Sequence, residues 1–141
     1  MSRVFLDTNI FIYLIEDEGK FGRMSTELID RLAARRDFVY TSTLTLGEVL
    51  TQPLSHGDKR LAESYEEKLS SPGMHILDFD RVAARNYARI RLDRTIKAPD
   101  AMQLSMAAAA RCDLFVTNDE RLSKKVVDGI QFICGLDRVP V

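Results

Sequence analysis

Short apolar runs alternate along this chain with segments in which apolar residues recur every three or four positions. The runs predict five strands, at residues 4–6, 38–40, 74–77, 114–116 and 130–134. The helical spacing predicts helices at residues 9–16, around 24–32, at 44–51, 59–69, 81–92 and 99–111, and a short helix after Asp119. Residues 53–58, which include Pro53 and Gly57, predict a turn.

The order of these elements predicts the fold class. Strands that alternate with helices and are apolar on both faces are typical of a parallel sheet covered on two sides. We therefore predict an α/β fold, a three-layer α/β/α sandwich with a central parallel sheet. With 141 residues the chain is long enough for one such domain, and we assign residues 1–141 to it.

Composition and charge exclude several classes of protein. Twenty Lys and Arg residues against 21 Asp and Glu residues argue against a protein that coats nucleic acid indiscriminately, but they allow a local basic face. The two cysteines exclude a disulfide framework and a four-cysteine zinc site. No apolar run approaches the ~20 residues of a membrane span and the N-terminus lacks a signal sequence, so we expect a cytoplasmic protein with no membrane partner. No GxxxxGK or GxGxxG motif supports a nucleotide cofactor.

Four acidic residues are predicted to reach the carboxyl edge of the sheet, where open parallel sheets form their binding sites. Asp7 directly follows the first predicted strand, and Asp119 comes just beyond the strand at 114–116. Glu48 lies on the short helix after the second strand. Asp100 lies in the first turn of a helix that is apolar nearly all round, which is typical of a buried helix.

Each of these acids also has an ordinary structural explanation. Asp7 and Asp119 stand where helix caps are common. Glu48 would face solvent, as most glutamates do, and Asp100 would interact favourably with the dipole of its own helix. Asp113 precedes its strand, so it is expected at the opposite edge and is left out of the set.

Taken together, the four carboxylates predict a metal site. Carboxylates gathered at one edge repel one another, and a divalent cation relieves this repulsion. An all-oxygen site selects a hard ion such as Mg²⁺ or Mn²⁺, and the two histidines, His56 and His75, stand too far apart in the sequence to suggest a softer site. Such a cation can polarise a phosphoryl oxygen and activate a water, so the fitting substrate is a phosphodiester.

Four sequence motifs carry a resemblance to a known family. They are Val4-Phe5-Leu6-Asp7-Thr8-Asn9, Leu46-Gly47-Glu48-Val49, Ala98-Pro99-Asp100-Ala101-Met102-Gln103-Leu104 and Phe115-Val116-Thr117-Asn118-Asp119. In this order and spacing the chain resembles, over essentially its whole length, the PIN-domain family and in particular the VapC-like toxin ribonucleases of toxin–antitoxin pairs. The resemblance implies a Mg²⁺- or Mn²⁺-dependent endoribonuclease with a cognate antitoxin. By its motifs the catalytic and metal-binding residues would be Asp7, Glu48, Asp100 and Asp119, supported through hydrogen bonds by Asn9 and Thr117.

Basic residues are the expected RNA contacts. Arg81, Arg85 and Arg89 recur every four residues and form a stripe on one face of a predicted helix, while Arg121 lies near Asp119. Phosphate contacts by these arginines would make RNA binding sensitive to salt, and a solvated helix flank is the alternative explanation. The apolar residues at positions 11, 12, 14 and 15 are assigned to the core, with a homodimer or antitoxin surface as their other use.

Two further functions stay open beside the preferred one, which is an endoribonuclease that hydrolyses RNA phosphodiester bonds as the toxin of a toxin–antitoxin pair. A phosphoacceptor receiver domain for signalling would use Asp78 or Asp80 as acceptor and Thr117 as switch, but the first strand ends in one acid rather than an adjacent pair. A non-catalytic RNA-binding module would use the same surface, and the presence of all four acids argues against it.

Overall fold

A five-stranded parallel sheet is the middle layer of the structure, a computed structural model that describes residues 1–141. Its strands are β1 (Arg3–Leu6), β2 (Phe38–Ser42), β3 (Met74–Leu77), β4 (Leu114–Val116) and β5 (Phe132–Cys134), in the order β3-β2-β1-β4-β5. Every pairing is parallel, and Val4 at the centre lies opposite Val39 on one side and Leu114 on the other. The carboxyl ends of the strands therefore meet at one edge of the sheet.

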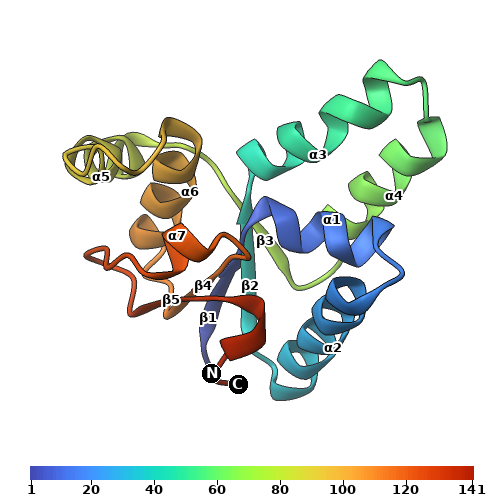
Figure 1. The fold of residues 1–141 in the computed structure, drawn as a ribbon, viewed down its shortest axis with the longest axis horizontal. Coiled ribbons are helices and arrows are strands. Elements are labelled where there is room, and N and C mark those ends of the chain that lie inside the picture. The colour runs from blue at the N-terminus through green and yellow to red at the C-terminus, as the bar shows by residue number, and fades with distance from the viewer.

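Helices cover both faces of the sheet (Figure 1). One face carries α1 (Thr8–Glu16), α2 (Lys20–Arg35), α3 (Thr43–Ser55) and α4 (Lys59–Leu69), and the other carries α5 (Arg81–Ile90), α6 (Ala98–Ala109) and the short α7 (Glu120–Ser123). A single 3₁₀ turn, Leu136–Arg138, follows β5. The predicted three-layer α/β/α sandwich is thus confirmed. None of the helices combines the length and the hydropathy of a membrane-spanning segment.

The alternation of side chains along β1 explains why there are two cores. Val4 and Leu6 pack with apolar residues of α1 to α4, whereas Phe5 points to the opposite face and packs with residues of α6. The ring of Phe5 stacks on that of Phe115 with 5.0 Å between centroids. Because the last three side chains of β1, those of Val4, Phe5 and Leu6, are completely buried, β1 is held at the centre of the sheet. The residue that follows it, Asp7, therefore lies at the middle of the carboxyl edge.

Most predicted elements are found within a few residues of their expected bounds, but one prediction is wrong. Residues 53–58 were expected to form a turn, whereas α3 continues through Pro53 and ends at Ser55. A proline lacks the N–H that an interior helical residue donates. Pro53 lies in the last turn of α3 with its ring buried, and its carbonyl still accepts the N–H of Asp58 at 2.8 Å. The helix therefore loses a single hydrogen bond there and continues.

The last strand also begins later than predicted. β5 starts at Phe132 rather than at residue 130, because Ile130 is used in a turn in which its N–H donates to the carbonyl of Val127 at 3.1 Å. Ile130 is nevertheless buried in the core on the α6 face. An apolar residue that anchors a turn and one that belongs to a strand look the same in the sequence.

Candidate functional site

Asp7 ends β1 and caps α1. Its Oδ1 accepts the N–H of Thr8 at 2.8 Å, and its Oδ2 accepts the hydroxyl of Thr117 at 2.8 Å. The residue is only 7% exposed. The pKa of Asp7 is raised to about 6, mainly by burial and also by the nearby charges of Asp100 and Glu48. The two hydrogen bonds act in the opposite direction and lower it. The capping explanation and an acidic site are therefore both consistent with this one residue.

Asp100 lies in the first turn of α6 and is half-buried. Burial raises the pKa of Asp100, the charges of Asp119 and Glu48 add to the effect, and Lys97 opposes it. The charge of Asp100 also raises the pKa of Asp7. The carboxylate of Asp100 is therefore electrostatically coupled to all three of the other predicted acids. Unlike them, it accepts no hydrogen bond from the protein.

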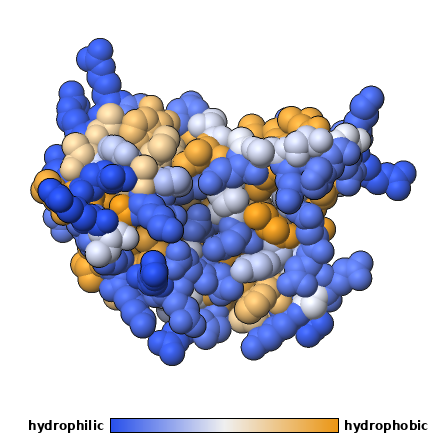
Figure 2. Space-filling view, turned by 45° about the horizontal axis from the view of Figure 1, so that its top comes forward, coloured by the Kyte–Doolittle hydropathy of each residue, from blue (hydrophilic) through white to orange (hydrophobic).

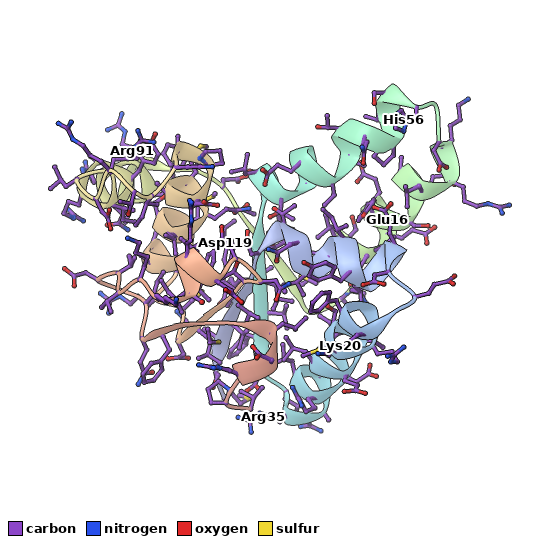
Figure 3. All side chains as sticks on the ribbon, in the orientation of Figure 1. Glu16, Lys20, Arg35, His56, Arg91 and Asp119 are labelled. Atoms are coloured by element: carbon purple, nitrogen blue, oxygen red, sulfur yellow. The ribbon has the colours of Figure 1, made fainter.

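Glu48 and Asp119 are more exposed. Glu48 lies on α3, and its Oε1 accepts the hydroxyl of Thr8 at 2.7 Å. Asp119 caps α7, with Oδ1 accepting the N–H of Arg121 at 3.0 Å and of Leu122 at 3.3 Å. It lies near the middle of the molecule, between the helices of the two faces (Figure 3). Its second oxygen takes no part in the cap and is open to another partner.

The two predicted supporting residues differ in what they touch. Thr117 is completely buried and donates to Asp7, while its oxygen accepts the N–H of Asp119 at 3.1 Å. It therefore links two of the acids directly. Asn9 forms no hydrogen bond with the carboxylates, and its Oδ1 accepts the N–H of Asn118 at 3.4 Å. Asn9 thus acts on the loop that leads to Asp119.

The four carboxylates have the chemistry that a hard cation prefers, but they are not gathered around one point in this structure. Carboxylate oxygens are the ligands that Mg²⁺ and Mn²⁺ prefer. Burial is the main cause of the raised pKa values of Asp7 and Asp100, and the neighbouring acids add a repulsion that a cation would relieve. No group of three or more Asp, Glu, His or Cys side chains is arranged so that it could hold a metal ion as it stands. Glu48 and Asp119 each use one carboxylate oxygen in hydrogen bonds within the protein, and the other oxygen of each accepts none.

Sequence reasoning missed the role of one buried amide. Gln103 on α6 is 2% exposed, and its side chain contacts Ser42, Thr45, Thr8 and Glu48 from three other elements. The only hint in the sequence is a lone amide in a helix that is otherwise nearly all apolar. Its partners lie 55 to 95 residues away along the chain, so no local pattern could have revealed them.

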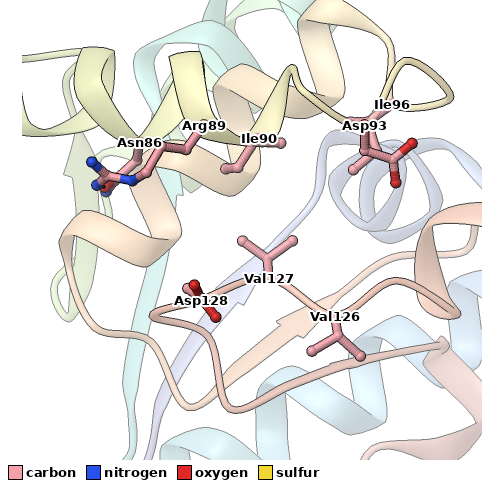
Figure 4. Close-up of a pocket in the computed structure, with 8 residues that line it drawn as sticks. All are labelled: Asn86, Arg89, Ile90, Asp93, Ile96, Val126, Val127 and Asp128. Carbon is pink, nitrogen blue, oxygen red and sulfur yellow. Dashed lines mark hydrogen bonds between the residues drawn. The ribbon is translucent and has the colours of Figure 1, made fainter.

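The four predicted RNA-binding arginines come from two helices, with Arg81, Arg85 and Arg89 on α5 and Arg121 on α7. Arg121 lines a cavity of about 80 Å³ together with Lys97, Asp100 and Asp119. Arg89 instead lines a separate cavity of about 240 Å³ between α5 and the segment 126–128 (Figure 4). Arg81 and Arg85 are exposed on α5. Figure 2 brings the carboxyl edge forward and shows hydrophilic residues there, with the hydrophobic ones in separate patches.

The structure also places the other residues that the sequence analysis discussed. Asp113 lies at the amino edge of the sheet, where its Oδ2 accepts the N–H of Arg3 at 2.7 Å. Asp80 caps α5 through a 2.9 Å hydrogen bond from Ala83 N–H, and it follows β3, which is an edge strand. Thr117 donates to Asp7 rather than to either receiver-type candidate. Of the four apolar residues at 11, 12, 14 and 15, only Ile12 is exposed, at 39%.

Comparison with known proteins gives a family and several structural neighbours. The sequence model of the PIN domain family matches residues 4–127. No curated protein matches the chain. DNA-bound VapBC from Salmonella typhimurium is similar at 24% identity and a TM-score of 0.76, over 96% of this chain and 99% of that one.

Two other solved structures are similar in the same way. VapBC2 from Rickettsia felis, bound to a DNA fragment from its promoter, has a TM-score of 0.74 at 21% identity, over 94% of this chain and 98% of that one. VapC20 from Mycobacterium tuberculosis, a Sarcin-Ricin loop cleaving toxin, has a TM-score of 0.65 at 16% identity, over 87% and 96%. At such identities the likeness establishes a shared fold.

Proposed function

Because the chain belongs to the PIN domain family, we propose that it is a divalent-metal-dependent endoribonuclease that hydrolyses RNA phosphodiester bonds. One observation carries the proposal. Asp7 and Asp100 lie 93 positions apart in the sequence, yet burial and the charges of their acidic neighbours raise the pKa of both. Perturbed acids of this kind concentrate at functional sites.

In this proposal Asp7, Glu48, Asp100 and Asp119 hold Mg²⁺ or Mn²⁺. When bound, the cation supplies Lewis-acid activation of the phosphodiester and stabilises the charge that develops on the transferring phosphate. Thr117 keeps the Asp7 carboxylate in one orientation and restrains the backbone at Asp119. Asn9 restrains the loop between Thr117 and Asp119 through its contact with Asn118.

The RNA backbone is proposed to approach along the basic side of the acidic site. Lys97 and Arg121 border the cavity that contains Asp100 and Asp119, and neither forms a salt bridge. Lys125, in the same cavity, is already paired with Asp93 at 3.0 Å. The unpaired positive charges of Lys97 and Arg121 offset the repulsion between the nearby carboxylates and the phosphates of RNA. The stripe of Arg81, Arg85 and Arg89 stays a proposed contact for RNA or for an acidic partner.

We also propose that the chain is the toxin of a toxin–antitoxin pair. The solved neighbours from Salmonella typhimurium and Rickettsia felis are VapBC assemblies, and the one from Mycobacterium tuberculosis is a Sarcin-Ricin loop cleaving toxin. A cognate antitoxin protein is therefore the expected partner. A homodimer is a second proposed assembly, for which the exposed Ile12 on α1 offers one apolar contact.

Incubation of the purified protein with total cellular RNA tests the proposed function. We expect discrete fragments in Mg²⁺ or Mn²⁺, none in chelator, and none with Asp7→Asn, with a 5′-phosphate and a 3′-hydroxyl at the cut ends. RNA that is bound equally with and without chelator and is never cut would instead support a non-catalytic RNA-binding module. Cleavage that survives both chelator and Asp7→Asn would contradict the proposal.

A further inference from the structure

A buried hydrogen-bond network lies beneath the acidic site. The amide of Gln103 is its centre, with Oε1 accepting the hydroxyl of Ser42 at 2.5 Å and Nε2 donating to Thr45 at 2.7 Å and to Thr8 at 3.1 Å. The hydroxyls of Thr8 and Thr45 lie 3.0 Å apart. Thr8 then contacts Glu48 at 2.7 Å. The network thus runs from α6, through the start of α3 and the first residue of α1, to a carboxylate at the rim.

The carboxylate of Glu48 determines which group donates in each hydrogen bond of this network. An ionised carboxylate only accepts hydrogen bonds, so the hydroxyl of Thr8 must donate to Glu48. Thr8 has a single proton, so it must accept from both Gln103 and Thr45. The nitrogen of the amide therefore faces the threonines, and its oxygen faces Ser42. The side-chain hydrogen bonds of the network therefore all run in one direction, from Ser42 through Gln103 and the threonines to Glu48.

The network is complete within the protein. Ser42 Oγ, which donates to Gln103, accepts the N–H of Thr45 at 3.1 Å. Ser42, Thr45 and Gln103 are all buried, and none of them leaves a buried side-chain N or O atom unpartnered. A fully satisfied buried polar network is rigid, because each alternative rotamer would leave a donor or acceptor unpaired. The hydroxyl of Thr8 is thereby held in one place.

We propose that Gln103 is a positioning residue that acts through Thr8 to hold the Glu48 carboxylate in the orientation in which it binds the divalent cation. This inference rests on the proposed function and extends it to residues that do not touch the substrate. Glu48 is on the exposed side of α3, and its remaining contact with Gln103 Nε2 is a long one of 3.5 Å. Without Thr8 the carboxylate would be free to turn toward solvent.

Matched substitutions at one position separate this role from a structural one. Thr8→Val keeps the shape of the side chain and removes the hydroxyl, whereas Thr8→Ser keeps the hydroxyl. Gln103→Leu removes the amide at the centre. Thr41→Val is the control for loss of a buried hydroxyl elsewhere, because Thr41 donates only to the carbonyl of Leu6 at 3.0 Å.

The primary measurement is the affinity of the metal-free protein for Mn²⁺. Electron paramagnetic resonance measures the concentration of unbound Mn²⁺ at each step of the titration. Loss of a hydrogen bond that orients a metal ligand typically weakens metal binding by about 10-fold or more. We expect that loss for Thr8→Val and Gln103→Leu, and affinities within about two-fold of wild type for Thr8→Ser and Thr41→Val. In cleavage assays the first two should need more Mn²⁺ for half-maximal activity, with the KM for RNA unchanged.

The outcomes are distinguishable. Wild-type binding of Mn²⁺ by Thr8→Val and by folded Gln103→Leu would overturn this inference and leave the proposed function standing. Failure of the wild-type protein to bind Mn²⁺ would overturn both. If Gln103→Leu does not fold, wild-type binding of Mn²⁺ by Thr8→Val would still overturn the inference, because Gln103 is proposed to act on Glu48 through the hydroxyl of Thr8.

Discussion

The hydroxyl of Thr117 donates a 2.8 Å hydrogen bond to Oδ2 of Asp7, a residue 110 positions earlier in the chain. The contact exists because β4 pairs with β1 in parallel, so that the residues which follow the two strands meet at the same edge. The oxygen of Thr117 also accepts the N–H of Asp119. One buried hydroxyl thus connects the two acids that follow the central strands.

Removal of this hydroxyl should raise the pKa of Asp7. The hydrogen bond from Thr117 favours the ionised carboxylate and opposes the effect of burial, which already raises the pKa of Asp7 to about 6. In Thr117→Val we therefore expect Asp7 to titrate at a higher pH than in wild type, as followed by NMR of the carboxyl carbon. Thr117→Ser retains the hydroxyl and should titrate as wild type. An unchanged titration in Thr117→Val would show that the contact does not stabilise the ionised form.

Replacement of Asp7 should stabilise the fold at neutral pH. In the folded protein the pKa of Asp7 rises from its ordinary 3.8 to about 6, so folding disfavours its ionised form. The resulting cost is absent below pH 3.8, where the carboxyl is protonated in both states, and is complete above about pH 6. Its size is about 3 kcal/mol. Without a divalent cation we expect the free energy of unfolding of Asp7→Asn to exceed that of wild type by about this much at pH 8, with no difference near pH 3.5.

A variant of opposite sign controls for a general effect of charge removal. Burial raises the pKa of Asp37, but hydrogen bonds from Arg35 and from the N–H of Ser2 outweigh it and lower that pKa overall. Ionised Asp37 therefore stabilises the fold at neutral pH, and this stabilisation is lost as the pH falls. Denaturant titrations of Asp37→Asn should show a loss of stability at pH 8. Equal changes in the free energy of unfolding of the two variants would contradict the claim that ionised Asp7 destabilises the fold.

The place of Asp7 could be predicted from the sequence because it depends on a local signal. Three consecutive apolar residues predict a buried strand, and the acid that follows must then lie at its carboxyl end. The same reasoning placed Asp113 at the opposite edge, where it is found beside Arg3. The roles of these acids in catalysis and metal binding stay predictions.

Gln103 and Pro53 mark where sequence reasoning ends. The partners of Gln103, Ser42 and Thr45, are brought to it only by the packing of α6 near β2 and α3, and nothing in the sequence near either site indicates the contact. Residues 53–58, which include Pro53, predict a turn, but the place of Pro53 in the last turn of α3 and the burial of its ring let the helix continue. Both depend on the tertiary structure.

The hydroxyl of Tyr65 should contribute to stability and not to activity. Tyr65 on α4 is 1% exposed, and its hydroxyl donates to the carboxylate of Glu16 at the end of α1. A hydrogen bond to a charged group contributes about 2 kcal/mol. We expect Tyr65→Phe to lose about that much unfolding free energy in urea while its RNA cleavage rate stays at the wild-type value. Glu16→Gln retains an acceptor and should lose less. Cleavage that falls in proportion to stability would instead connect α4 to the site.

RNA binding should depend on Lys97 and Arg121. Each phosphate contact that is lost lowers the slope of log affinity against log salt by about 0.7 for single-stranded RNA. With RNA kept intact by chelator, we expect Lys97→Ala and Arg121→Ala each to weaken binding and to reduce this slope. Lys59→Ala, on the exposed N-terminus of α4, is the matched control and should leave both unchanged. Equal slopes in all the variants would exclude the cavity beside Asp100 as a phosphate contact.

The central claim is that acids distant in sequence act together at the carboxyl edge of the sheet, and a paired substitution tests it most directly. Asp100→Asn removes the charge that is coupled to the other three acids, and Asp113→Asn removes a charge at the amino edge beside the same strand, β4. The measurement is the rate of Mg²⁺-dependent cleavage of one RNA by wild type and both variants, each verified as folded. We predict that Asp100→Asn loses about 100-fold or more, as expected for loss of a metal-binding carboxylate, while Asp113→Asn cleaves at the wild-type rate. Full Mg²⁺-dependent cleavage by Asp100→Asn would contradict the account.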